Sequence, residues 1–112
     1  MSQITTHILD TSIGKPAQGV SIHLEENFSG NWKKIAEGIT NTDGRISDLL
    51  PNEKVLDSGI YRLVFDTQSY FTNQNIKTFY PQVIIEFEIA DATHYHVPLL
   101  LNPFGYSTYR GS

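Results

Sequence analysis

Three basic side chains occupy positions from which predicted β-strands could present them for chemistry. His7 interrupts the run Ile-Thr-Thr-His-Ile-Leu, His96 opens the run His-Val-Pro-Leu-Leu-Leu, and Arg45 follows the turn sequence Asn-Thr-Asp-Gly. A histidine titrates at about pH 6.5, so it can accept or release a proton at neutral pH. An arginine stays charged and offers a planar set of N–H donors to carbonyl or enolate oxygens. Two histidines and an arginine therefore suffice for water to attack an activated carbonyl, without a metal or a covalent nucleophile.

These residues also have ordinary structural interpretations. A lone histidine in a strand is usually a structural or surface residue, and an arginine after an Asp-Gly turn is usually solvated. His94 and His96 share one face of a predicted strand, a spacing that suits a metal ion. The chain has no cysteine and no evident third ligand, so we expect no metal site. His23 alternates with Ser21 and Glu25 and is expected on an exposed face.

Other sequence signatures of catalysis are absent. There is no G-x-S-x-G sequence, which makes a serine hydrolase an unfavoured interpretation. There is also no P-loop, no G-x-G-x-x-G and no H-E-x-x-H sequence. We therefore expect an activity that needs no cofactor.

The carboxyl end carries several polar groups in sequence. Tyr109, Arg110, Gly111 and Ser112 directly follow a predicted strand. Final residues usually fray. If this segment is ordered, it places a phenol, a guanidinium, a hydroxyl and a carboxylate in one small region. The residues alone leave open whether it is.

Composition favours a single domain over residues 1–112, with 39% hydrophobic residues and a net charge of −4. The basic residues are scattered, with Lys33-Lys34 the only adjacent pair, so we expect no nucleic-acid surface. The longest apolar run, residues 97–101, is far shorter than the roughly 20 residues of a membrane helix. The first ten residues lack the features of a secretory signal. Since cysteine is also absent, we expect a cytoplasmic protein.

The elements that must position the candidate residues are short strands. Apolar and polar residues alternate with period two, and turn residues such as Asp43-Gly44 interrupt them at short intervals. Alternation places His7 on one strand face with Thr5 and Leu9. Asp66 is expected to cap the one helix, over residues 67–74. The predicted strands cover residues 4–9, 20–26, 32–40, a short stretch from Arg45, 60–66, 83–89, 95–101 and 106–110. This spacing favours an all-β, antiparallel sandwich of about eight strands with one short helix, in which residues 95–101 form a central strand.

Four segments of the chain resemble the transthyretin-related 5-hydroxyisourate hydrolases. They are THILD (6–10), NTDGR (41–45), HYHVPLLL (94–101) and PFGYSTYRGS (103–112). The resemblance covers essentially the whole chain, with the segments in order and at the expected separations. The ending Tyr-Arg-Gly-Ser distinguishes these hydrolases from transthyretin itself, whose chain shares the preceding Tyr-Ser-Thr but continues differently.

The resemblance implies a transthyretin-like fold and a homotetramer, a dimer of dimers with the active site in a channel between the dimers. It implies hydrolysis of 5-hydroxyisourate to 2-oxo-4-hydroxy-4-carboxy-5-ureidoimidazoline in purine catabolism. The family's catalytic residues correspond to His7, Arg45 and His96. Substrate binding falls to Arg45 and to the tail formed by Tyr109, Arg110, Gly111 and Ser112.

On this basis His7 and His96 are expected to position and deprotonate a water molecule, and either one can be the general base. Arg45 is expected to hold substrate oxygens and stabilise the charge that develops on the carbonyl. One alternative is a non-catalytic transthyretin-like carrier of small aromatic ligands, which has no need of these residues together. Another is a plain β-sandwich adhesion or scaffold module, in which basic residues would not converge on an apolar cleft.

Overall fold

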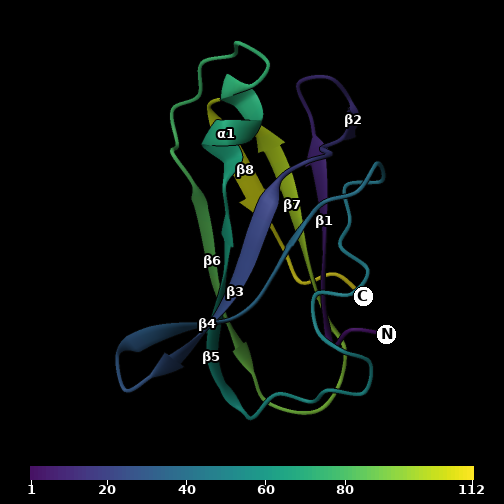
Figure 1. The fold of residues 1–112 in the computed structure, drawn as a ribbon, viewed down its shortest axis with the longest axis vertical. Coiled ribbons are helices and arrows are strands. Elements are labelled where there is room, and N and C mark those ends of the chain that lie inside the picture. The colour runs from purple at the N-terminus through teal and green to yellow at the C-terminus, as the bar shows by residue number, and fades with distance from the viewer.

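A computed structural model describes all of residues 1–112 as two four-stranded sheets that pack face to face (Figure 1). The strand order is β2-β1-β7-β8 in one sheet and β4-β3-β5-β6 in the other. In chain order the elements are β1 (Ile4–Asp10), β2 (Lys15–Pro16), β3 (Ser21–Phe28), β4 (Asn31–Ile39), β5 (Gly59–Phe65), α1 (Thr67–Thr72), β6 (Val83–Ile89), β7 (Tyr95–Asn102) and β8 (Gly105–Thr108). The predicted all-β sandwich with eight strands and one helix is therefore confirmed.

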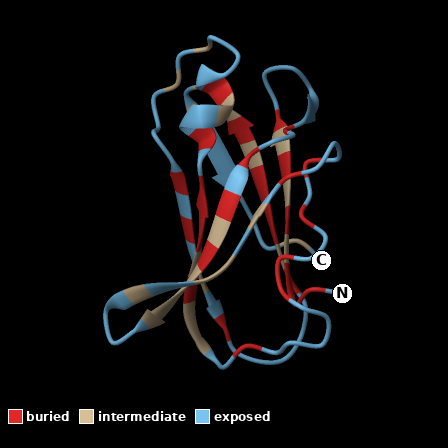
Figure 2. Cartoon of the chain, in the orientation of Figure 1, coloured by how far each residue is buried: buried red, intermediate tan, exposed pale blue.

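The alternation of residue types along the strands agrees with the pattern of buried residues in the structure. Along β1 every second residue is buried, while Thr5, His7 and Leu9 are half-buried on the other face. Buried residues occur along the strands of both sheets (Figure 2), and their side chains belong to one hydrophobic core. Its largest fully buried members are Tyr61, Phe65 and Phe71. The apolar faces of β1 and β7 pack in this core. Because successive side chains of a strand point to opposite faces, the histidines of β1 and β7 lie on the outer face of their sheet.

The pairing of β1 with β7 is parallel, whereas an antiparallel sandwich was expected. All other strand pairs are antiparallel. Alternation reports which face of a strand is buried but not the direction of its neighbour, so the sequence pattern could not specify this pair. β7 lies between β1 and β8, as expected for the most apolar strand.

Two local features differ from the predicted pattern of strands. Arg45 forms a single isolated bridge with His7 rather than the start of a strand. Lys15 and Pro16, which lie outside the predicted strands, form the short edge strand β2 against Leu9 and Asp10. Both differences arise from pairing with β1, which a local pattern does not reveal.

The helix α1 begins after Asp66, as predicted, and ends two residues earlier than expected. The Asp66 carboxylate accepts hydrogen bonds from the backbone N–H and the hydroxyl of Ser69. Tyr70 fixes the helix to the other sheet, because its hydroxyl donates to the buried Asp10 carboxylate at 2.7 Å. Burial and this contact with Asp10 raise the pKa of Tyr70 to about 12.

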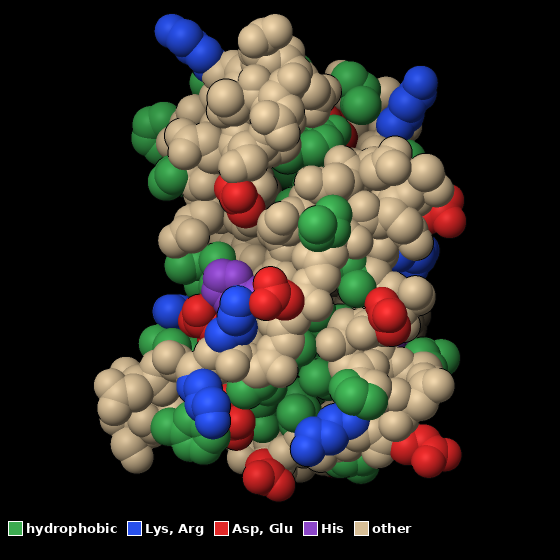
Figure 3. All heavy atoms as spheres, in the orientation of Figure 1, with side chains coloured by type: hydrophobic (Ala, Val, Ile, Leu, Met, Phe, Trp, Pro, Cys, Tyr) green, Lys and Arg blue, Asp and Glu red, His purple; other side chains and the backbone are tan.

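Charged side chains of both signs are interspersed over the face seen in Figure 3, without a patch of one sign. The view is consistent with the scattered basic residues of the sequence. With only six residues, α1 is too short to cross a lipid bilayer, and no helix of the structure is long and apolar enough to do so.

Candidate active site

The candidate site begins with the register between β1 and β7. In this parallel pair Thr5 lies opposite His96, and His7 lies opposite Pro98. The alternate residues of both strands, including Ile4 and Tyr95, are buried in the core. The side chains of Thr5, His7 and His96 therefore share the outer face of the β2-β1-β7-β8 sheet.

Arg45 is brought to this face by the turn that follows β4. The Asn41 side-chain oxygen accepts hydrogen bonds from the backbone N–H groups of Asp43 at 2.9 Å and Arg45 at 3.1 Å. Gly44 has a φ of +72°, and a Cβ there would collide with the backbone oxygen of Ile8. Glycine is thus required both by the backbone conformation and by the close approach to β1. The consequence is the bridge that sets Arg45 opposite His7.

The carboxyl-terminal tail is ordered against β7. The backbone N–H of Gly111 donates to the backbone oxygen of His96 at 2.9 Å, and the two residues form an isolated bridge. A Cβ on Gly111 would lie 2.5 Å from Cδ2 of His96, so only glycine fits beside this ring. The sequence left open whether the tail is ordered. In the structure its backbone is hydrogen-bonded at Gly111 to β7, the strand that carries His96.

Arg45, His96 and Ser112 line one open hollow of about 590 Å³. Both chain ends lie at this hollow, on one side of the sandwich (Figure 1). The remaining lining residues are Met1, Thr5, Thr6, Asn41, Asp43, Ile46, Ser47 and His94. Most of its lining residues are polar or charged, and they include a guanidinium, a carboxylate and two imidazoles.

The other tail residues lie on the far side of His96. Tyr109 and Arg110 line a neighbouring hollow of about 270 Å³, which His96 also lines. The Arg110 guanidinium carbon lies 4.4 Å from the centre of the Tyr95 ring, a cation–π distance. Within one chain, then, His96 lines both hollows, sharing one with Arg45 and Ser112 and the other with Tyr109 and Arg110. His7 shares the sheet face but does not line the first hollow.

The electrostatics of the site favour neutral imidazoles. Burial lowers the pKa of His7, and the positive charge of Arg45 lowers it further, against a smaller raising effect of Asp43. Burial also lowers the pKa of His96, helped by Arg45, His94 and His7. An imidazole with a lowered pKa is unprotonated at neutral pH and can accept a proton.

Thr5 and His94 belong to the site but were not assigned a catalytic or substrate-binding role from the sequence. The Thr5 hydroxyl lies within hydrogen-bonding distance of ring nitrogens of both His94 and His96. The predicted alternation already placed Thr5 beside His7, and the two histidines on a common face, but nothing local indicated that the groups meet. His94 and His96 do share a face, with ring centres 6.2 Å apart. The structure contains no group of three or more potential metal ligands.

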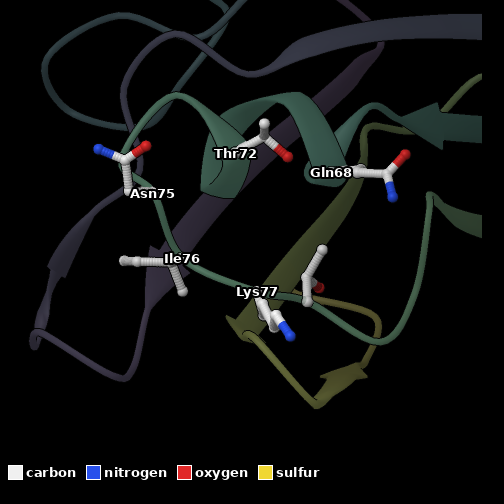
Figure 4. A pocket seen from close by; sticks show the side chains of 6 residues that line it. Gln68, Thr72, Asn75, Ile76 and Lys77 are labelled. Atoms are coloured by element: carbon white, nitrogen blue, oxygen red, sulfur yellow. The ribbon is translucent and has the colours of Figure 1, made fainter.

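The hollow beside α1 lacks comparable chemistry. It has a volume of about 350 Å³ and is lined by Gln68, Thr72, Asn75, Ile76, Lys77 and Thr78 (Figure 4). Lys77 is its only charged group, and no histidine or carboxylate faces it. On the opposite sheet His23 is paired with Glu25 at 2.8 Å, which agrees with its expected place on an outer face.

Comparison of the sequence with known proteins gives a consistent result along its whole length. The HIUase/Transthyretin family model matches residues 4–111. A 5-hydroxyisourate hydrolase of Salmonella dublin is 47% identical over 110 residues, which span 97% of this chain and 80% of the relative. A 5-hydroxyisourate hydrolase of Mus musculus is 43% identical over 114 residues, which span 99% of this chain and 96% of the relative.

Comparison of the fold with solved structures agrees. The structure of Klebsiella pneumoniae 5-hydroxyisourate hydrolase matches with a TM-score of 0.86 at 37% identity, covering 97% of this chain and 98% of the other. Sea bream transthyretin in complex with thyroxine matches with a TM-score of 0.91 at 33% identity, covering 98% of this chain and 95% of the other.

Proposed function

This chain belongs to the HIUase/Transthyretin family, and we propose that it is a 5-hydroxyisourate hydrolase of urate degradation in which Arg45, His96 and Ser112 form the core of the substrate site. The observation that carries this proposal is the meeting of these three residues in one hollow, from three separate parts of the chain. The relatives named as hydrolases of this substrate support the activity, because they are similar to this chain over nearly its full length.

The proposed chemistry is water attack on the ring amide of the substrate, which opens the six-membered ring. His7 and His96 position and deprotonate the water, one as general base and the other as its orienting partner. The lowered pKa of each histidine supports this role, because the neutral form that accepts a proton predominates at pH 7. Hydrolysis yields 2-oxo-4-hydroxy-4-carboxy-5-ureidoimidazoline and requires no cofactor.

Arg45 holds the substrate oxygens and stabilises the negative charge that grows on the carbonyl as it becomes tetrahedral. Its planar set of N–H donors suits the several carbonyl groups of a small planar substrate. The backbone of Arg45 is fixed by the Asn41 turn and by the bridge to His7, so the side chain that carries the guanidinium starts from a well-defined position. Losing one such donor typically slows turnover by about 10²–10³-fold.

The tail supplies the remaining substrate contacts. Ser112 lies in the hollow, and Gly111 keeps the tail close to His96. We assign Tyr109 and Arg110 to substrate binding from the family resemblance, although within a single chain they line the adjacent hollow. We further propose a homotetramer, a dimer of dimers in which two outer faces of the β2-β1-β7-β8 sheet close a channel over the substrate. The absence of cysteine supports a cytoplasmic location.

The experiment that tests the function generates 5-hydroxyisourate with urate oxidase and follows its absorbance with and without the protein. We expect decay faster than the spontaneous rate and proportional to protein concentration. Decay at the spontaneous rate would reject the hydrolase and favour a carrier. Thyroxine, which sea bream transthyretin holds in its solved complex, would then be the first ligand to test.

A further inference from the structure

We propose that Thr5 and His94 are positioning residues that keep the proton of neutral His96 on Nδ1 and so leave Nε2 as the basic atom of the site. The inference rests on the proposed hydrolase function and adds two residues and one defined tautomer to it. It starts from the contacts of a single hydroxyl group between two imidazole rings.

The hydroxyl oxygen of Thr5 lies 2.8 Å from Nδ1 of His96 and 2.7 Å from Nε2 of His94. Both distances are those of good hydrogen bonds. The two rings lie nearly parallel, at 24°, on either side of the hydroxyl. Because Thr5 comes from β1 and the histidines from β7 and its approach, strand register creates the arrangement.

A hydroxyl carries one proton, so it can donate to only one of these two nitrogens and must accept from the other. One ring therefore presents an N–H to Thr5, and the other presents a lone pair. The tautomers of His94 and His96 are coupled in this way through a single oxygen.

The proposed catalytic role selects between the two arrangements. Since Nδ1 of His96 is occupied by Thr5, His96 can deprotonate a water molecule in the hollow only through Nε2. Nε2 has a free lone pair in the neutral ring only when the proton is on Nδ1. In that state Nδ1–H of His96 donates to Thr5, and the Thr5 hydroxyl donates to Nε2 of His94. His94 then carries its own proton on Nδ1.

The solvent exposure of Thr5, His94 and His96 agrees with their proposed roles. Thr5 and His96 are half-buried, whereas His94 is exposed at the start of β7. The groups that affect His96 electrostatically are His94 just before β7, His7 on β1 and Arg45 from the turn. The other charged or titratable groups at its two hollows are Asp43, Glu86, Glu88, Tyr109, Arg110 and the terminal Ser112. None of these except His94 contacts the Thr5 hydroxyl, so the tautomer of His96 depends on Thr5 and His94.

The kinetic test compares Thr5→Val, which removes the hydroxyl at nearly constant shape, with Thr5→Ser, which retains it. We expect Thr5→Val to lower kcat by on the order of 10-fold with KM changed less than about twofold, because a mixed tautomer population weakens the base without altering substrate contacts. Thr5→Ser is expected to retain most of the activity. The matched control is Thr11→Val, since the Thr11 hydroxyl also bonds β7, at the Leu101 oxygen, but far from His96.

A second readout is independent of activity. ¹⁵N NMR of the imidazole nitrogens distinguishes a protonated Nδ1 from a protonated Nε2. We expect His96 of the unaltered protein to carry its proton on Nδ1, and both Thr5→Val and His94→Phe to give a mixture. A His96 protonated on Nε2 in the unaltered protein, or a folded Thr5→Val with unchanged kcat, would overturn the inference. An unaltered protein without hydrolase activity would instead reject the proposed function, and the NMR result would still decide the tautomer.

Discussion

The backbone N–H of Gly111 donates a hydrogen bond to the backbone oxygen of His96, which joins the last residues of the chain to the strand that carries the histidines. The contact places the tail against the His96 ring so closely that a Cβ on Gly111 has no room. Ser112 is thereby held at the hollow that Arg45 also lines. A backbone hydrogen bond therefore helps to order this part of the site, together with the contact of Arg110 with the Tyr95 ring.

Replacing Gly111 with alanine should therefore damage the site without unfolding the protein. The added methyl group must displace the tail or the His96 ring, and a displacement of about 1 Å can cost on the order of 10²-fold in turnover. Gly105→Ala is the control, because a Cβ there meets only ordinary contacts with Asn102. The check is kcat together with the melting temperature. Equal activity in the two variants would show that the tail does not shape the site.

Removing either site histidine should slow turnover strongly. We expect His7→Ala and His96→Ala each to lower kcat by about 10²–10⁴-fold, the range for loss of a positioned general base. His23→Ala, on the opposite sheet and paired with Glu25, is the matched control and should leave kcat unchanged. Circular dichroism checks folding. Near-normal turnover in a folded His96→Ala protein would contradict the proposed water activation.

The pH dependence of the site should follow the lowered pKa values of His7 and His96. Because the neutral imidazole is the active form, activity should persist below about pH 6.5 and fall only at the lower pKa of the folded protein. Arg45→Gln removes a positive charge that lowers both values, so both should move upward. NMR titration of the histidine ring protons measures this shift even if turnover is lost. If the pKa values of His7 and His96 are unchanged in Arg45→Gln, the guanidinium does not lie close enough to the imidazoles to influence them.

Gly44→Ala should weaken both stability and function. The residue has a positive φ, and its Cβ would strike the backbone of β1, so we expect a loss of about 3 kcal/mol or more in the free energy of unfolding. Gly14→Ala is the control: its φ is also positive, but the space around it is open, so the loss should be about 1–2 kcal/mol. Urea unfolding measures both. Equal losses would show that the close approach to Ile8 is unimportant.

The protein should sediment as a tetramer of its 12.7 kDa chain at micromolar concentration. The reason is that the proposed channel needs a second sheet face to exclude water from the hollow, which is open in a single chain. Analytical ultracentrifugation measures the species present. A single 12.7 kDa species with full hydrolase activity would show that one chain forms a complete site.

The sequence by itself determined the features that depend on local order. Alternation with period two identified the sandwich and placed His7 on the same strand face as Thr5 and Leu9, because neighbouring side chains of a strand point in opposite directions. Asp66 identified the start of the helix, and the tail motif pointed to Ser112. Residue types and positions indicated His7, Arg45 and His96, the family resemblance assigned roles to them and to the tail, and the shared fold agrees with the family.

Tertiary structure alone decided which distant residues meet. The parallel pairing of β1 with β7 joins segments about 90 residues apart, and this pairing brings the Thr5 hydroxyl between His94 and His96. Tertiary structure also brings Gly44 close to β1 and Gly111 close to His96. Alternation is a property of one strand, whereas neighbours, directions and register follow from how all the apolar faces are buried together. For that reason the sequence indicated His7, Arg45 and His96 separately, and only the folded sheet showed that Thr5 links two of the chain's histidines.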